Sequence, residues 1–420
     1  MQKLNTKRTI LTGLAFLSIC TFWQIYDSII PLILKEDFAI GDTLSGVIMA
    51  LDNVLALFLL PVLGALSDKT HTKLGRRMPY ILAGTACAVV FMMLLPVSAK
   101  ARNLPLFLAA LALTLLSMSL YRSPAVALMP DLTPKPLRSK GNAIINLMGA
   151  VGGVMALGFI TVMVPKTENP DYTAVFAAAA IVMVVSVTIL ALTIRENKMA
   201  VKDEPEEKEM TENVPQRGLS APEKRSLVLI LASVFFWFMG YNAVTTAFSK
   251  YARAYWGLTG GAFAYTLIIA QAAAICAYLP VAALSQRIGR RKTILCGVTG
   301  LTLAFGAAVF FRSFNYGMFA LFALAGISWA AINVNSYPMV VELAKGADVG
   351  KYTYTFSMAA QIITPILSGF LLENAGYHTL FPYGAVCVAV SFFTMLFVRH
   401  GDAKTEKLSS KLEAFASPDD

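Results

Sequence analysis

Long apolar stretches dominate this chain and leave few folds open to it. About twelve of them reach roughly 20 residues, the length that an α-helix needs to cross a bilayer. Lipid offers the backbone no hydrogen-bond partners, so only helices or closed barrels span it, and these stretches are too long for barrel strands. We therefore expect an all-α integral membrane protein with twelve transmembrane helices. The expected spans are residues 9–34, 44–66, 79–98, 104–129, 141–164, 173–195, 226–250, 260–285, 293–311, 316–341, 351–372 and 378–398.

One polar segment divides the apolar stretches into two sets of six. Residues 196–225 mix both charges and almost lack large apolar side chains, so they cannot bury a core and are expected to form a disordered cytoplasmic linker. Only 14% of the chain is charged, against about 25% in soluble proteins. The predicted parts are an N-terminal six-helix bundle (1–195), the linker (196–225), a C-terminal six-helix bundle (226–398) and a cytoplasmic tail (399–420).

The distribution of positive charge predicts the orientation of the chain. With both termini on one side, that side holds about 27 of the 35 Lys and Arg residues, against about seven on the other. This bias places both ends in the cytoplasm and explains the net charge of +10 without a nucleic-acid partner. The first apolar stretch carries Asp27 and lacks a clear cleavage site, so it is expected to be a retained span and not a signal peptide. We expect a multi-pass protein of the cell membrane, acting as a monomer.

A repeated basic loop indicates that the two sets of helices share one plan. Residues 64–80, GALSDKTHTKLGRRMPY, have a shortened copy in residues 282–291, AALSQRIGRR. The Phe-Trp pair at 22–23 in the first span also has a counterpart at 236–237 in the seventh. Such internal repeats are typical of secondary transporters, and they predict two pseudo-symmetric six-helix bundles.

These features resemble the major facilitator superfamily. Within it, SDKTHTKLGRRMPY and YRSPAVALMPDLTPKPLRSKGNA (residues 121–143) resemble the glycoside–pentoside–hexuronide:cation symporters and the related sucrose carriers. One position departs from the sucrose carriers, which have Arg two residues after the proline of the fourth helix; here Val126 stands there, and Arg122 lies one turn earlier. The resemblance implies uptake of a sugar together with H⁺ or Na⁺, by alternating access around a midplane site.

Charged residues inside spans are costly and usually functional. Asp27 and Asp52 lie at a similar depth in the first two spans, where their negative charges would repel each other. A bound proton or cation would relieve this repulsion. With Asn53 they could also supply hard oxygen ligands to a small cation. We expect these three residues to couple the ion, although each carboxylate could instead bond a neighbour and lock packing. The five cysteines and three histidines lack a metal-ligand spacing, so no cofactor or metal site is expected.

Aromatic and amide side chains inside the spans predict a sugar pocket. An indole can stack on the C–H face of a sugar ring, and amides can pair with hydroxyls, within otherwise apolar walls. Arg122 could donate a fork of hydrogen bonds to substrate, or it could snorkel or pair with Asp131. A transmembrane Trp is also often only an anchor or a core residue. The expected substrate residues are Trp23, Gln24, Tyr26, Arg122, Trp237, Tyr241, Asn242, Gln271, Trp329, Asn333, Asn335 and Gln361.

The basic loops are expected to gate the cytoplasmic side. Gly75 permits a tight turn, and Arg76 and Arg77 can pair with Asp131. By the resemblance, Asp68 would sit at a helix N-terminus of the opposite half and latch the halves together. The second copy has Gln286 in place of this acid, so its latch should be weaker. The gating residues are Asp68, Gly75, Arg76, Arg77 and Asp131, with Arg290, Arg291 and Glu342 in the second half.

Three functions remain open at this point. A sugar:cation symporter is favoured by the polar, Trp-bearing spans. A proton-driven exporter of drug-like or metabolite cargo uses the same fold. A transport-inactive receptor or scaffold would have no need of intramembrane charges. No nucleophile triad, metal cluster or phosphate loop supports an enzyme.

Overall fold

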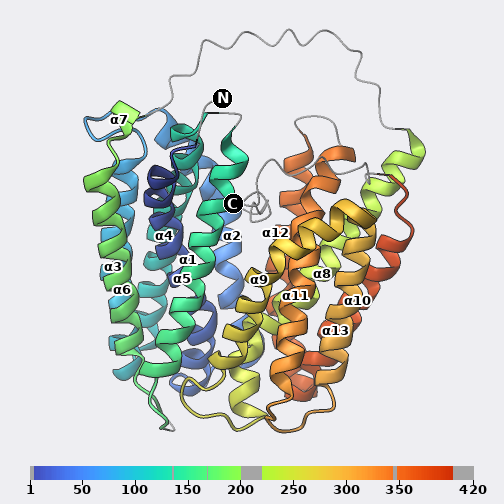
Figure 1. Ribbon diagram of the computed structural model, residues 1–420. Helices are drawn as coiled ribbons and strands as arrows, with labels where there is room; N and C mark the ends of the chain where they lie inside the picture. The colour runs from blue at the N-terminus through green and yellow to red at the C-terminus, as the bar shows by residue number, and fades with distance from the viewer. Residues whose placement is uncertain (1–3, 135–136, 168, 200–219, 344–347, 401–420) are drawn as a thin grey trace.

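A computed structural model describes residues 4–134, 137–167, 169–199, 220–343 and 348–400 (Figure 1). The described residues form an all-helical fold with twelve long helices, as predicted. The first six are α1 (Thr6–Glu36), α2 (Asp42–Asp68), α3 (Met78–Lys100), α4 (Leu104–Leu132), α5 (Arg138–Met163) and α6 (Thr173–Thr193). The second six are α8 (Ala221–Ala254), α9 (Ala264–Ile288), α10 (Arg290–Ala308), α11 (Met318–Leu343), α12 (Asp348–Ala375) and α13 (Leu380–Leu396). The short α7 (Glu196–Met199) follows α6, and the 3-10 turn η2 (Tyr377–Thr379) precedes α13.

Eleven of these helices are long and apolar enough to cross a membrane, counted over the described residues. The twelfth, α10, opens with three basic residues and does not meet that criterion. The predicted linker was too long at both ends, because residues 196–199 form α7 and α8 begins at Ala221. Residues 200–219 and the tail from 401 lie outside the described residues.

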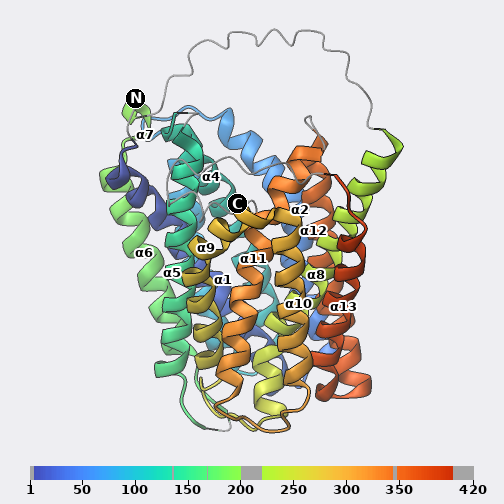
Figure 2. The same cartoon turned by 45° about the vertical axis from the view of Figure 1, so that its right-hand side comes forward.

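The helices stand in two groups, α1–α6 on the left of Figure 1 and α8–α13 on the right. The loop of residues 69–77 and α7 lie together at the upper end, which we call the basic end. The opposite end, where α1 stops and α2 starts, is called the far end. Three helix pairs join the groups: α2 packs on α12, α5 on α9 and α1 on α8. The turned view in Figure 2 also shows α5 beside α9.

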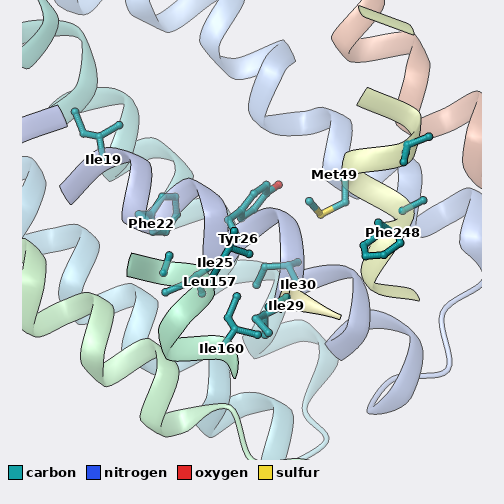
Figure 3. Packing of buried hydrophobic residues seen from close by; sticks show 14 of the residues in the cluster. Ile19, Phe22, Ile25, Tyr26, Ile29, Ile30, Met49, Leu157, Ile160 and Phe248 are labelled. Carbon is teal, nitrogen blue, oxygen red and sulfur yellow. The ribbon is translucent and has the colours of Figure 1, made fainter. Parts of the chain in front are cut away.

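Residues on the inner face of α1 form the centre of the core. Phe22, Ile25 and Tyr26 are almost fully buried. Figure 3 shows them in one cluster with Leu157 of α5, and with side chains from α2 and α8. The core therefore continues across the boundary between the two groups of helices.

Glycines set the spacing between α2 and α12. A Cβ on Gly46 would fall well inside 3.0 Å of the Pro365 carbonyl, and one on Gly369 would meet the Asp42 carbonyl in the same way. Neither backbone could come this close if the glycine carried a side chain. Glycines of the second and eleventh spans thus lie at a contact between the groups.

Candidate functional site

A cavity of about 350 Å³ lies between the two groups of helices. This is within the size range of small-molecule sites. Helices α1 and α5 form one wall, and α8, α9, α10 and α11 form the other. The side chains predicted for substrate that line it are Gln24, Tyr241, Asn242, Gln271 and Trp329, together with the predicted coupling residue Asp27.

Asp27 is the one carboxylate among the residues that line this cavity. It lies on α1 less than one turn from Gln24, whose Nε2 donates to Ser28 Oγ at 3.2 Å. Among the described residues Asp27 has no hydrogen bond or ion pair. The carboxylate thus remains available to a proton, a cation or a substrate hydroxyl.

An aromatic pair faces Asp27 from the other group of helices. The rings of Tyr241 on α8 and Trp329 on α11 stack with centroids 3.7 Å apart and planes 4° from parallel. Phe238 contacts Trp329 edge to face and steadies it. Asn242 and Gln271 stand beside the pair in the cavity lining. The cavity therefore combines a carboxylate on one side with flat apolar rings and amides on the other.

Asp52 and Arg122 line a different and much smaller void inside the first group. This void of about 10 Å³ has Trp23, Asp52, Asn53, Ser119 and Arg122 in its wall. Asn53 Nδ2 donates to Asp52 Oδ1 at 2.7 Å, and the Arg122 guanidinium lies 5.9 Å from the Trp23 ring centroid. The two predicted coupling carboxylates thus line different voids, and their joint role stays a prediction. Tyr26 packs against Trp23 with ring centroids 5.3 Å apart and does not line the central cavity.

Four further residues predicted for substrate lie away from the cavity lining. Trp237 is fully buried, and Asn335 accepts from Ser285 and donates to the Ala331 carbonyl at 2.9 Å. Asn333 and Gln361 are partly buried and do not line the cavity. For Trp237 and Asn335 the geometry is that of packing residues, because hydropathy alone does not tell which face of a buried helix turns toward a cavity.

The basic loop forms an ion-pair cluster within the first group of helices. Asp131 accepts from Arg76 at 2.7 Å and from Arg77 Nε at 2.9 Å. Arg77 also pairs with Asp68. All of these residues belong to the first group, and within the part of the chain that the structure describes Asp68 forms no ion pair with the second group. The predicted gating role stays a prediction.

Glu196 holds this loop in place and was missed by the sequence reasoning. Its carboxylate accepts from the backbone N–H groups of Arg76 at 2.9 Å and Met78 at 3.1 Å, at the start of α3. An acid at a helix N-terminus satisfies donors that have no partner inside the helix. The sequence signal for this role is an acid directly after the sixth span, at the first position of the predicted linker.

The second copy of the loop shares one backbone feature with the first, a glycine with positive φ. Gly75 has φ +119° and Gly289 has φ +93°, and each stands before an Arg-Arg pair. Arg291 donates to the Leu396 carbonyl at 2.6 Å, while Arg290 is partly buried. The side chain of Glu342 lies outside the described residues. The internal repeat is therefore visible in the turn geometry.

Comparison with known proteins identifies the family. The model of the Major Facilitator Superfamily matches residues 12–279 and 230–418. The chain belongs to the Major Facilitator Superfamily. It is thus a secondary transporter of small molecules and a multi-pass membrane protein, and not an enzyme.

Solved structures share the fold at low identity. The nucleoside transporter NupG (a point mutant) superposes with a TM-score of 0.69 at 12% identity, covering 93% of this chain and 98% of its own. The xylose transporter XylE from E. coli, in an inward open conformation, gives 0.65 at 14%, covering 97% and 98%. The POT family transporter PepTSo gives 0.68 at 10%, covering 95% and 98%. No curated protein matches the chain.

Charged residues close the far end of this superfamily member. Asp42, the first residue of α2, accepts from Lys250 of α8 and from Lys35 of α1, each at 2.8 Å. Tyr377 of η2 donates to Asp42 at 2.8 Å, and Arg253 of α8 pairs with Glu36 of α1. These residues lie at or just beyond the ends of the expected spans, and pairs so distant in the chain leave no local sequence pattern.

Proposed function

We propose that the protein is a symporter that takes up a sugar or glycoside together with H⁺ or Na⁺. The observation that carries the proposal is that Asp27, the Tyr241–Trp329 pair and the cavity amides all line the same cavity. Flat rings suit the C–H face of a sugar, and a carboxylate and amides suit its hydroxyls. This lining is more polar than a purely drug-like cargo would require.

Asp27 is the proposed coupling group. A carboxylate without a partner is costly in a membrane, so neutralisation by an ion favours the conformations that carry it across. Asp52 and Asn53 are proposed to tune this site from the neighbouring void and not to share its ion. Both termini are proposed to be cytoplasmic in the cell membrane, which makes the basic end the inner one, and the chain is proposed to work as a monomer.

Uptake into proteoliposomes tests the proposal. Purified protein receives a panel of labelled sugars and glycosides under an imposed proton gradient, a sodium gradient or neither. We expect accumulation of at least one of them under one gradient only, with stoichiometric movement of that ion. Extrusion of hydrophobic cations and no sugar flux would establish the exporter instead. The absence of flux with either cargo class would favour a receptor or scaffold.

A further inference from the structure

The lining of the central cavity is negatively charged. Asp27 is the one acid among the described residues that line the cavity, and none of those residues is Lys, Arg or His. The other polar side chains of the lining are amides and hydroxyls, from Gln24, Tyr241, Asn242, Thr245, Gln271 and Tyr278. A cargo that enters this cavity therefore meets one carboxylate whose charge the lining does not balance.

Other buried acids of the protein have a cation beside them. Asp52 shares its small void with the Arg122 guanidinium, and the two charges attract each other. Asp42 pairs with Lys250 at 2.8 Å, outside the cavity lining. Asp27, in contrast, forms no ion pair among the described residues, and the charge that acts on it, that of Asp52, is also negative. The cavity thus needs one positive charge from outside the protein.

A sugar hydroxyl does not supply this charge. It donates a hydrogen bond to a carboxylate but leaves the net charge of the closed cavity at minus one, which is costly within a membrane. A protonated amine on the sugar ring supplies three N–H donors and a positive charge together. Hydrogen bonds between ionised groups are roughly twice as strong as those between neutral groups.

Aromatic side chains surround the remaining part of the cavity and also favour a cation. They come from α8, α9, α10 and α11, and they are Tyr241, Tyr278, Phe305, Phe322 and Trp329. The face of an aromatic ring attracts a positive charge, whereas the C–H face of a sugar packs against the same rings. The rings and the carboxylate therefore favour the same kind of cargo.

We propose that the cavity takes a sugar or glycoside that carries a protonated amine, and that this amine pairs with Asp27. The inference rests on the proposed function, which supplies the sugar, and adds the charged group that the sugar bears. Such a cargo takes the place of the coupling ion at Asp27, because both neutralise the same carboxylate. Amides of the lining hold the hydroxyls of the ring.

The test measures binding to the purified full-length protein by calorimetry in detergent, without any ion gradient. Three matched pairs of ligands differ only in an amine against a hydroxyl: glucosamine and glucose, galactosamine and galactose, mannosamine and mannose. At about pH 6.5 the amines are protonated. At least one amino sugar should bind about tenfold or more tighter than its parent sugar. Its N-acetyl derivative, which keeps the nitrogen but loses the charge, should lose this advantage.

Two variants locate the charge that gives this preference. Asp27→Asn should reduce the affinity ratio of amino sugar to parent sugar to less than about threefold. Asp52→Asn removes a charge of the same sign from the neighbouring void, and its ratio should stay within about threefold of that of the wild type. Equal loss of the preference in both variants would assign it to the general negative potential and would overturn the pairing with Asp27.

The wild-type protein alone also decides the proposal. Equal affinity for the members of every pair would overturn it and would leave the cavity as a site for neutral sugars. Binding of none of the sugars would count against the proposed function itself and against this inference with it. Tighter binding of tetraphenylphosphonium, a cation without hydroxyls, than of every amino sugar would assign the cavity to hydrophobic cations and overturn both.

Discussion

At the scale of single residues, Gly75 shows how one backbone angle supports a whole loop. Its φ of +119° lies in a region that side-chain-bearing residues rarely adopt. A Cβ there would also overlap the Glu196 carboxylate. That carboxylate caps the start of α3 and thereby aims Arg76 and Arg77 at Asp131. The turn, the cap and the arginine pair thus depend on one another.

Gly75→Ala should therefore destabilise the protein by roughly 2–3 kcal/mol, since strain and overlap add. Gly257→Ala is the control, because Gly257 also has positive φ (+67°) but nothing lies within 4 Å of the place that a Cβ would take there. The control should lose only about 1 kcal/mol. Thermal unfolding in detergent measures both variants, and equal losses would show that Glu196 yields without cost.

At the scale of helices, α2 and α12 make a close contact near the far end. Gly46 lies against the Pro365 carbonyl, one turn from Asp42. Packing between helices in a membrane has no hydrophobic driving force, so backbone proximity at small residues matters more than in water. Contacts at Gly46 and Gly369 thus hold the same two helices that Glu373 of α12 joins by accepting from the Thr43 backbone N–H at 2.7 Å.

Gly46→Ala should separate α2 from α12 at a cost of roughly 1–3 kcal/mol. The test uses a cysteine at Ala150, which lines the cavity, in a chain whose five native cysteines are replaced by serine. We expect an impermeant maleimide added on the far-end side of membrane vesicles to label this cysteine faster in Gly46→Ala. Gly158→Ala in α5 is the control, because nothing lies within 4 Å of a Cβ at that position. Unchanged labelling in Gly46→Ala would mean that the helices tolerate the methyl group without opening.

The helices also show how much of the fold can be predicted from the sequence. Apolar run length placed all twelve long helices, because lipid imposes both length and helical hydrogen bonding. It did not predict which polar side chains meet. Asp52 and Asp27 looked equivalent by depth but face different voids, and Lys250 finds Asp42 across 208 positions of the chain. Depth follows from counting residues, whereas facing and distant pairing depend on helix rotation and packing.

At the scale of the whole molecule, the far end should respond to pH through Asp37. Burial and the neighbouring Glu36 carboxylate raise the pKa of Asp37 from 3.8 to about 6, although Arg102 and Arg253 oppose the shift. A raised carboxyl pKa means that the folded state binds the proton more tightly. Its stabilisation is fully present below pH 3.8 and is lost as the pH rises through about 6.

Asp37→Asn mimics the protonated form and should remove this loss. Between pH 4 and pH 7.5 the wild-type protein should lose about 1 kcal/mol more than the variant, after allowance for solvent screening of a partly exposed group. Unfolding midpoints at a series of pH values measure the difference. Parallel curves for the two proteins would assign the pH dependence to other groups.

Transport itself tests whether the carboxylate in the cavity carries the ion. Asp27→Asn removes the charge of the side chain and keeps its shape. The carrier without substrate then needs no ion to neutralise residue 27 before it passes from one access state to the other. Gradient-driven accumulation should fall by at least about tenfold, while exchange of substrate across a preloaded vesicle should keep at least about a third of its rate. The control is Asp171→Asn, because the ion pair of Asp171 with Lys100 is exposed and outside the cavity.

Exchange needs substrate binding and the change of access state but no net ion movement. Loss of both activities in Asp27→Asn would therefore make Asp27 a substrate ligand, and loss of neither would make it structural.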